Sequence, residues 1–259
     1  MWDSYVWGKQ TLAQLAGSYG KSIPWTRKML DTYIPIVTLI KPQPLVLLAD
    51  VTFFGRGYGI LVFRSQKLKK NIYWKEIAQE NPWIYREARI ELENKGFTIT
   101  GMVLDGKRGI REVFSDVPVQ MCQFHQIAIL KRYLTSRPQT DAGKELRAIG
   151  LALTVLTAED FTILLNEWHE RWKDFLKEKT FGVDKKHWNY THKRIRSTYR
   201  SLKTNLPFLF TYQKYPKLEM PHTTNSIDGF FGKTKMLLQV HRGLSQEHRY
   251  KVIQEIFGE

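Results

Sequence analysis

Two aspartates stand at positions where a carboxylate could do chemistry. Asp50 directly follows the apolar run of residues 45–49, and Asp105 directly follows the apolar residues 102–104. Short continuous apolar runs are typical of strands buried on both faces, so both carboxylates are predicted at strand ends. An ionised carboxylate in such a place is costly unless something compensates it, and a bound cation is a common answer.

Taken singly, each aspartate is more simply explained as the cap of a turn or a helix. As a pair on neighbouring strands, Asp50 and Asp105 could hold hard divalent ions, which take oxygen ligands. A third carboxylate arriving from a helix would complete a two-metal site for in-line displacement at phosphorus.

The segments that must position these aspartates show strand patterns first and alternating strand and helix patterns later. Strands are predicted at residues 45–49, 58–63, 67–73, 98–104 and 117–122, and helices at residues 82–95 and 107–114. The first two strands are predicted to pair as a hairpin, because the turn between them carries Gly55, Gly57 and Gly59. This order predicts a mixed α/β sheet flanked by helices.

Residues 126–215 show helical patterns, and a final helical region is predicted to begin near residues 223–225. Within the first stretch, one amphipathic stripe is made by Trp168, Trp172, Phe175 and Leu176. Such a stripe is typical of a core. The basic residues 185–200 instead suit contact with a DNA backbone, with a ring available to stack on an unpaired base. The candidate DNA contacts there are Lys193, Arg194, Arg196 and Trp188.

Residues 1–35 are predicted to form a small helix-turn-helix. Residues 11–16 have helical spacing, Gly20 breaks the pattern, and Ser22 and Pro24 favour a new helix at residues 23–33. In a helix-turn-helix the second helix enters the major groove of DNA. The predicted apolar side of that helix is Trp25, Met29 and Leu30, and the candidate base readers are Thr26, Arg27 and Lys28. A plain helical hairpin is the alternative.

The charge balance favours a polyanionic partner. Forty Lys and Arg against 25 Asp and Glu give a formal charge of +15 and a pI near 9.8. Nucleic acid is the usual partner of such a surplus, although an incidentally basic surface is the alternative. A single cysteine, Cys122, excludes an internal disulfide framework. No apolar run approaches the roughly 20 residues of a membrane helix, so we expect a cytoplasmic protein that binds DNA and no membrane.

Four short motifs occur in a characteristic order along the chain. They are Leu48-Ala49-Asp50, Val103-Leu104-Asp105-Gly106, Cys122-Gln123-Phe124-His125 and Thr223-Thr224-Asn225-Ser226-Ile227-Asp228. In this order they resemble bacterial insertion-sequence transposases related to the eukaryotic Mutator-like group. The resemblance covers about residues 45 to 240, most of the chain.

The resemblance implies a ribonuclease H-like catalytic core interrupted by an all-helical insertion. The core would comprise residues 45–125 and 216–259, and the insertion residues 126–215. Asp50 and Asp105 would be the first two ligands of Mg²⁺, with Mn²⁺ as a substitute. Asp228 would be the third ligand, although the family usually has Glu there. The shorter side chain requires a closer approach of its helix, so a catalytically inactive relic is an alternative.

The Cys122–His125 pair matches the Cys-x-x-His signature that follows the second aspartate in this family. The resemblance therefore suggests His125 as a catalytic-site residue that touches DNA or the scissile phosphate. A buried structural cysteine with a hydrogen-bonded histidine is an alternative. A structural zinc site is disfavoured because it needs four ligands, and one cysteine cannot supply the customary set.

These observations together predict a DNA transposase. It would cut at the terminal inverted repeats of a transposon and join the freed 3′-hydroxyl to target DNA, without a covalent protein–DNA intermediate. At least two protomers would pair the ends, and the protein would be associated with the bacterial nucleoid. Two rivals remain, namely a catalytically inactive transposase-derived DNA-binding protein and a ribonuclease H-like nuclease without strand transfer.

Overall fold

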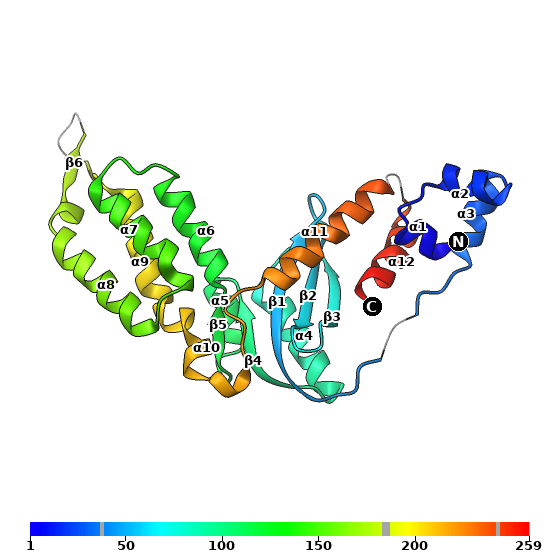
Figure 1. Ribbon diagram of the computed structural model, residues 1–259, viewed down its shortest axis with the longest axis horizontal. Coiled ribbons are helices and arrows are strands. Elements are labelled where there is room, and N and C mark those ends of the chain that lie inside the picture. Colours follow the sequence, from blue (N-terminus) through cyan, green and yellow to red (C-terminus); the bar gives the residue numbers. More distant parts are fainter. Residues whose placement is uncertain (37–38, 183–186, 242–243, 259) are drawn as a thin grey trace. The chain divides into compact units, whose positions relative to one another are not determined.

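The protein contains the predicted mixed sheet of five strands (Figure 1). The computed structural model describes residues 1–36, 39–182, 187–241 and 244–258. The strand order is β3-β2-β1-β4-β5. The strands are β1 (Pro44–Phe53), β2 (Gly59–Ser65), β3 (Lys70–Ile77), β4 (Thr98–Leu104) and β5 (Val119–Met121). β2 and β3 are antiparallel, whereas β4 is parallel to both β1 and β5.

Helices separate the strands on the parallel side of the sheet. α4 (Pro82–Asn94) connects β3 to β4, and α5 (Arg108–Val113) connects β4 to β5. Asn81 is the N-cap of α4, and its side chain accepts a hydrogen bond from the Ile84 N–H. Parallel neighbours need such crossover connections. The sheet order and its flanking helices confirm the predicted mixed α/β sheet with helices on its connections.

β1 is longer than the apolar run that predicted it. The strand continues past Ala49 to Phe53, so Asp50 lies inside the strand, and the prediction that it stands at the strand end is wrong. The reason is that Val51, Thr52 and Phe53 are β-branched or aromatic residues, which favour extended backbone. The fully buried part of the strand ends at Ala49. Asp50 and Val51 are half-buried, and Phe53 is exposed.

The chain forms two compact units. The first unit comprises residues 1–43, 50–80 and 225–259, and the second comprises residues 44–49 and 81–224. The boundaries of these units therefore cut through the predicted core segment 45–125. The first unit contains α1 (Trp2–Val6), α2 (Leu12–Tyr19), α3 (Ile23–Asp31), β2, β3, α11 (Asn225–Val240) and α12 (Gln246–Phe257).

The N-terminal helices have the expected helix–turn–helix order. Thr11 and Gln14 form a reciprocal capping box at the start of α2. Gly20 ends α2 with a φ of 61°, a left-handed conformation in which glycine is unstrained. Ser22 then caps α3 by accepting a hydrogen bond from the Trp25 N–H. These local signals explain why the chain reverses between the two helices.

The second unit carries the long helical segment and its core. The helices are α6 (Gln123–Leu134), α7 (Asp141–Leu151), α8 (Ala158–Trp172), α9 (Lys193–Leu209) and α10 (Thr211–Lys214), with 3-10 turns at Ala152–Thr154, Phe175–Lys177 and Pro216–Leu218. Trp168 is buried and donates its indole N–H to the Ala142 carbonyl at 3.0 Å. Leu176 is also buried, and Trp172 and Phe175 pack against the same cluster. The predicted stripe is therefore core.

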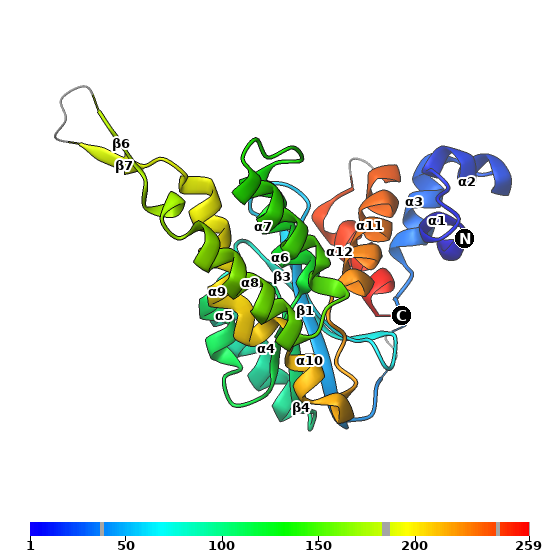
Figure 2. The same cartoon turned by 60° about the vertical axis from the view of Figure 1, so that its left-hand side comes forward.

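The sequence patterns predicted helices throughout residues 126–215, and this prediction is wrong for two short segments. β6 (Lys179–Phe181) and β7 (Trp188–Tyr190) form an antiparallel two-stranded ladder (Figure 2). The strands contain Thr180, Phe181, Trp188 and Tyr190, residues that favour extended backbone. Three residues on each side are too few to show an alternating pattern in the sequence. Residues 185 and 186 of the basic stretch lie outside the described residues.

Over the described ranges, no helix has both the length and the apolarity that crossing a bilayer requires.

Candidate active site

Asp50 is held in β1 beside its most deeply buried residues. Leu47, Leu48 and Ala49 are almost fully buried, and the half-buried Asp50 follows them. One carboxylate oxygen, Oδ1, accepts the Val51 N–H at 2.8 Å. The strand thus presents a fixed carboxylate directly after a dry apolar segment, where a compensating positive charge has its largest effect.

Asp105 occupies the turn that follows β4. Its Oδ1 accepts the Lys107 N–H at 3.0 Å, and its Oδ2 lies 4.0 Å from the Lys107 ammonium. Its side chain is 22% exposed. The turn contact is the capping role that a lone aspartate would have. It occupies only part of the lone-pair capacity of the carboxylate.

The two aspartates have equivalent places in adjacent parallel strands. The register pairs Leu48 of β1 with Val103 of β4. Asp50 follows Leu48 by two residues, and Asp105 follows Val103 by two residues. Both aspartates therefore lie toward the carboxyl ends of the two parallel strands. Open α/β sheets bind their ligands outside these ends.

Cys122 joins two motifs that are far apart in the sequence. It is fully buried, follows β5, and donates its N–H to the Leu104 carbonyl at 2.8 Å. Its sulfur accepts the hydroxyl of Thr224 at 3.2 Å and the Thr224 N–H at 3.3 Å. The Gln123 N–H also donates to the His222 carbonyl at 2.9 Å. The residues that precede α11 are thus bound to the start of α6.

The thiol of Cys122 has a perturbed pKa. Burial raises the pKa, but hydrogen bonds with His125 and Thr224 outweigh it and leave the pKa below its ordinary value. The half-buried His125 lies in the first turn of α6, one turn beyond Cys122. The contacts of Cys122 agree with a buried, hydrogen-bonded structural cysteine. Contact of His125 with DNA stays a prediction.

Asp228 carries an unsatisfied buried oxygen. It lies in the first turn of α11, where the helix dipole favours a negative charge. Its Oδ2 is buried and has no hydrogen-bond partner among the described residues. A buried carboxylate oxygen without a donor is costly, so a cation or a proton would stabilise it.

The three aspartates do not form a ready ligand set. Among the residues that the structure describes, no three His, Cys, Asp or Glu side chains gather in a group that could hold a metal ion. The chemistry of the individual donors nevertheless fits Mg²⁺ or Mn²⁺, because all three supply carboxylate oxygens and Asp228 has one without a partner.

The predicted base readers do not share one surface. Arg27 and Lys28 are exposed on α3, but Thr26 is fully buried and donates its hydroxyl to the Ser22 carbonyl at 3.1 Å. The prediction of Thr26 as a base reader is therefore wrong. Trp25 and Met29, which were predicted to be on the apolar side, are instead exposed, and Leu30 is buried as predicted. The inward face of α3 is thus made by Thr26 and Leu30.

The predicted DNA contacts of the helical segment differ in their surroundings. Trp188 is 44% exposed, and the Lys179 ammonium lies 3.7 Å from its ring centre. Lys193 and Arg194 are exposed at the start of α9. Arg196 stacks on Tyr190 at 3.5 Å and donates to the Leu176 carbonyl, so it contributes to the fold. Trp168 and Trp172 belong to the core.

Sequence reasoning missed the role of Thr224 and a separate network of buried amide side chains. Gln126 accepts a hydrogen bond from Asn205 at 2.8 Å, and Asn205 accepts one from Arg111 at 3.2 Å. Burial lowers the pKa of Arg111, while the charge of Asp105 opposes this effect. The available signal for this network was the spacing of three glutamines at intervals of three residues, namely Gln120, Gln123 and Gln126. The structure shows that all three are fully buried.

Comparisons with known proteins add little to these observations. No protein-family model matches the chain, and no curated protein matches it. A solved structure that is similar in part is a chain from the cryo-EM structure of the simian T-cell lymphotropic virus intasome in complex with PP2A regulatory subunit B56 gamma. The match has 9% identity and a TM-score of 0.26, and it covers 55% of this chain and 67% of the other. The fold therefore rests on the sheet topology given above.

Proposed function

We propose that the chain is a metal-dependent DNA transposase in which Asp50, Asp105 and Asp228 hold the ions. The observation that supports this most strongly is the equivalent placement of Asp50 and Asp105 on adjacent parallel strands of a mixed sheet. The buried, unpartnered oxygen of Asp228 supplies the reason for a third ligand. The formal charge of +15 supports DNA as the substrate.

Each aspartate has a distinct task in this proposal. Asp50 would hold its carboxylate inside β1, Asp105 in the turn after β4, and Asp228 in the first turn of α11. When bound, divalent ions supply an activated oxygen nucleophile and stabilise charge at the scissile phosphate. The hydrogen bonds between Thr224 and Cys122 hold the residue that leads into α11.

The finer parts of the proposal concern DNA recognition. Arg27 and Lys28 of α3 would contact the terminal inverted repeats, and Lys193, Arg194 and Trp188 would contact the flanking duplex or an unpaired base. His125 would lie against the scissile strand. At least two protomers would hold the two transposon ends during cleavage and joining.

The test is a cleavage assay with separate readouts for nicking and joining. A labelled duplex that carries the DNA flanking the coding sequence is incubated with Mg²⁺ or Mn²⁺ and a plasmid target. We expect Asp50→Asn, Asp105→Asn and Asp228→Asn each to abolish both products. Asp174→Asn is the matched control, because Asp174 is exposed and pairs only with Lys177 among the described contacts. Cleavage that survives all three substitutions would refute the proposal.

A DNA-binding protein without cleavage is the second candidate. It is favoured by Asp228 in place of the glutamate of the similar family and by the lack of a ready ligand group in the described residues. It predicts specific binding to the same duplex and no metal-dependent product. Nicked DNA without joined product would instead indicate a nuclease.

A further inference from the structure

A cavity of about 540 Å³ in the second unit is lined by cations. Its walls come from the end of α8, the 3-10 turn at Phe175–Lys177, β7 and α9. The five Lys and Arg side chains that line it are Lys173, Lys177, Arg196, Arg200 and Lys203. The described residues that line the cavity include no carboxylate. A concave site with charges of one sign concentrates ligands of the opposite sign, so this cavity suits a polyanion.

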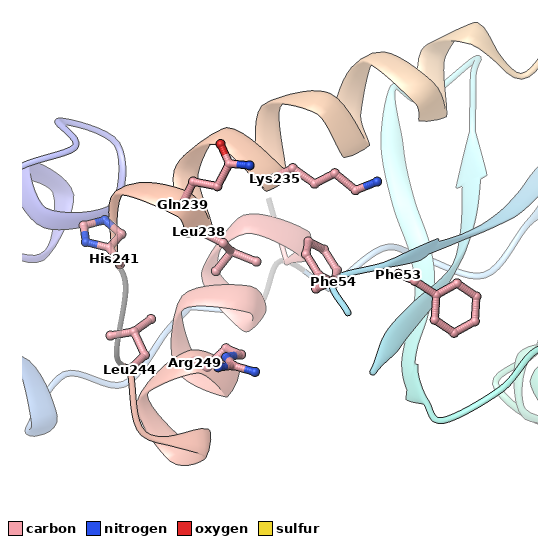
Figure 3. A pocket seen from close by; sticks show the side chains of 8 residues that line it. All are labelled: Phe53, Phe54, Lys235, Leu238, Gln239, His241, Leu244 and Arg249. Atoms are coloured by element: carbon pink, nitrogen blue, oxygen red, sulfur yellow. The ribbon is translucent and has the colours of Figure 1, made fainter. Parts of the chain in front are cut away.

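A cavity of the first unit differs from it in charge and arrangement (Figure 3). Among the described residues that line this other cavity, only Lys235 and Arg249 are Lys or Arg. The ring of Phe53 points away from the other lining side chains, so these residues do not surround one ligand. The cavity of the second unit is therefore the better candidate for a binding site.

One face of α9 supplies three of the five cations. Arg196, Arg200 and Lys203 follow one another at intervals of four and three residues, which places them on one side of the helix. Arg200 and Lys203 are exposed, and neither makes an ion pair with a described carboxylate. Lys173 and Lys177 differ, because they pair with Glu170 at 2.7 Å and with Asp174 at 2.9 Å. The positive charge that stays unpaired within the described residues therefore comes from α9.

These charges are unfavourable for α9 itself. Like charges three or four residues apart destabilise a helix, and Arg200 has such a neighbour on both sides, Arg196 and Lys203. The first turn of α9 contains no acidic residue, although the helix dipole favours negative charge there. In the sequence of α9 there are five Lys and Arg residues and no Asp or Glu. A bound anion would offset the repulsion between these cations.

The aromatic side chains of the cavity already have partners. His169 of α8 stacks on Tyr199 of α9, with 4.5 Å between the ring centres and 5° between the planes. The Arg196 guanidinium lies 3.5 Å from the ring centre of Tyr190 in β7. These contacts hold the walls of the cavity together and cover one face of each tyrosine. A nucleic acid base needs an open ring face, whereas a phosphate needs only the cations, so the cavity favours phosphates.

We propose that this cavity binds backbone phosphates of duplex DNA, with Arg200 and Lys203 as two of the contacts. The two residues lie about 4.5 Å apart along the helix, close to the rise of about 3.4 Å per nucleotide of one DNA strand. They therefore suit neighbouring phosphates of the same strand. Phosphate contacts carry no sequence information, so the cavity would bind any duplex. The proposal rests on the proposed function for DNA as the polyanion, but phosphate binding needs neither metal nor cleavage.

The test measures binding of two duplexes of equal length and unrelated sequence by fluorescence anisotropy in EDTA. We expect Arg200→Gln and Lys203→Gln each to reduce the salt slope by about 0.9, the value of one phosphate contact. Since that slope acts over the tenfold range from about 0.1 M to about 1 M salt, each variant should bind both duplexes about eightfold more weakly at about 0.1 M. Lys131→Gln is the matched control, because Lys131 is exposed in the last turn of α6 and does not line the cavity. It should change the affinity less than about twofold.

Thermal unfolding without DNA separates binding from a role in the fold. Arg200→Gln removes two repulsive neighbours in α9, so its unfolding midpoint should equal or exceed that of wild type. A lower midpoint together with weaker binding would mean that Arg200 serves the fold, and it would overturn the proposal.

The remaining outcomes separate this inference from the proposed function. Equal losses for Arg200→Gln and Lys131→Gln would show that only total charge matters, and a loss confined to one duplex would show base recognition. Either result would overturn the phosphate site. Unchanged affinity in both cavity variants would overturn it even if the aspartate variants abolish cleavage. Weaker binding by the cavity variants together with undiminished cleavage by Asp50→Asn would retain the phosphate site and refute the metal assignment.

Discussion

Thr224 donates two hydrogen bonds to the sulfur of Cys122, a residue 102 positions earlier in the chain. Cys122 follows β5, the strand next to β4, and Thr224 immediately precedes the helix that carries Asp228. A buried sulfur that accepts both a backbone and a side-chain donor has little freedom to move. The contact therefore holds the residue that precedes α11 against the residue that follows β5.

This contact predicts a pH dependence of stability. The folded-state pKa of Cys122 is lowered below its ordinary value because donors stabilise the thiolate. The stabilisation is fully present above the unfolded-state pKa and is lost as pH falls through the folded-state pKa. The difference in unfolding free energy between wild type and Cys122→Ser should therefore grow as pH rises toward about 9. Thr224→Val should raise the thiol pKa and shrink this gain. Urea titrations at several pH values measure both, and a difference independent of pH would contradict the assignment.

Two glycines in helices should respond to alanine with opposite signs. At Gly232 of α11, an added Cβ meets no atom within 4 Å. Gly232→Ala should therefore stabilise the protein by about 1 kcal/mol through helix propensity. At Gly150 of α7, the Cβ would lie 1.8 Å from a methyl carbon of Leu130, so Gly150→Ala should destabilise by about 1–3 kcal/mol. Denaturant unfolding measures both, and changes of the same sign would show that the packing around one helix is incorrect.

Two tryptophans should separate stability from DNA binding. Trp168 is buried and hydrogen-bonded to Ala142, so Trp168→Ala should cost about 3–5 kcal/mol. Trp188 is exposed on β7, so Trp188→Ala should change stability by about 0.5 kcal/mol or less while it weakens DNA binding. Thermal unfolding and duplex binding are measured on the same samples. A large stability loss in Trp188→Ala would place that ring in the core instead.

The helix α3 should contact DNA through its exposed cations alone. Arg27→Gln and Lys28→Gln should each lower duplex affinity and reduce the salt slope by about 0.9, the value of one phosphate contact. Thr26→Ser keeps the buried hydroxyl and should leave affinity unchanged. Binding titrations at several salt concentrations test this. If Thr26→Ser weakens binding as much as the two charge variants, the orientation of α3 is wrong.

Local signals in the sequence predicted most elements but not the contacts between them. β4 was predicted with its observed bounds, and α4 was predicted because Ile84, Ala88 and Leu92 have helical spacing and Gly96 marks its end. The inward face of α3 was assigned incorrectly, since Trp25 and Met29 are large and apolar, whereas the neighbouring helices decide which side is covered. β6 and β7 were not predicted because three residues are too few to show the alternation of apolar and polar residues that marks a strand. The Thr224–Cys122 contact joins residues too distant for any single-sequence pattern.

The candidate site was predictable to a similar degree. Asp50 and Asp105 were selected by apolar runs that the structure shows as adjacent parallel strands. Asp228 was selected by its motif, and its buried, unpartnered oxygen became visible only in the structure.

The single-turnover rate of Mg²⁺-dependent DNA cleavage by Asp105→Asn tests the central claim most directly. Removing a ligand that supports several kcal/mol of charge stabilisation should lower this rate at least about a thousandfold relative to wild type. The substitution keeps the size of the side chain and its acceptor for the Lys107 N–H, so the unfolding midpoint should stay close to that of wild type. Asp174→Asn should cleave at the wild-type rate. A fully folded Asp105→Asn protein that also cleaves at the wild-type rate would contradict the account.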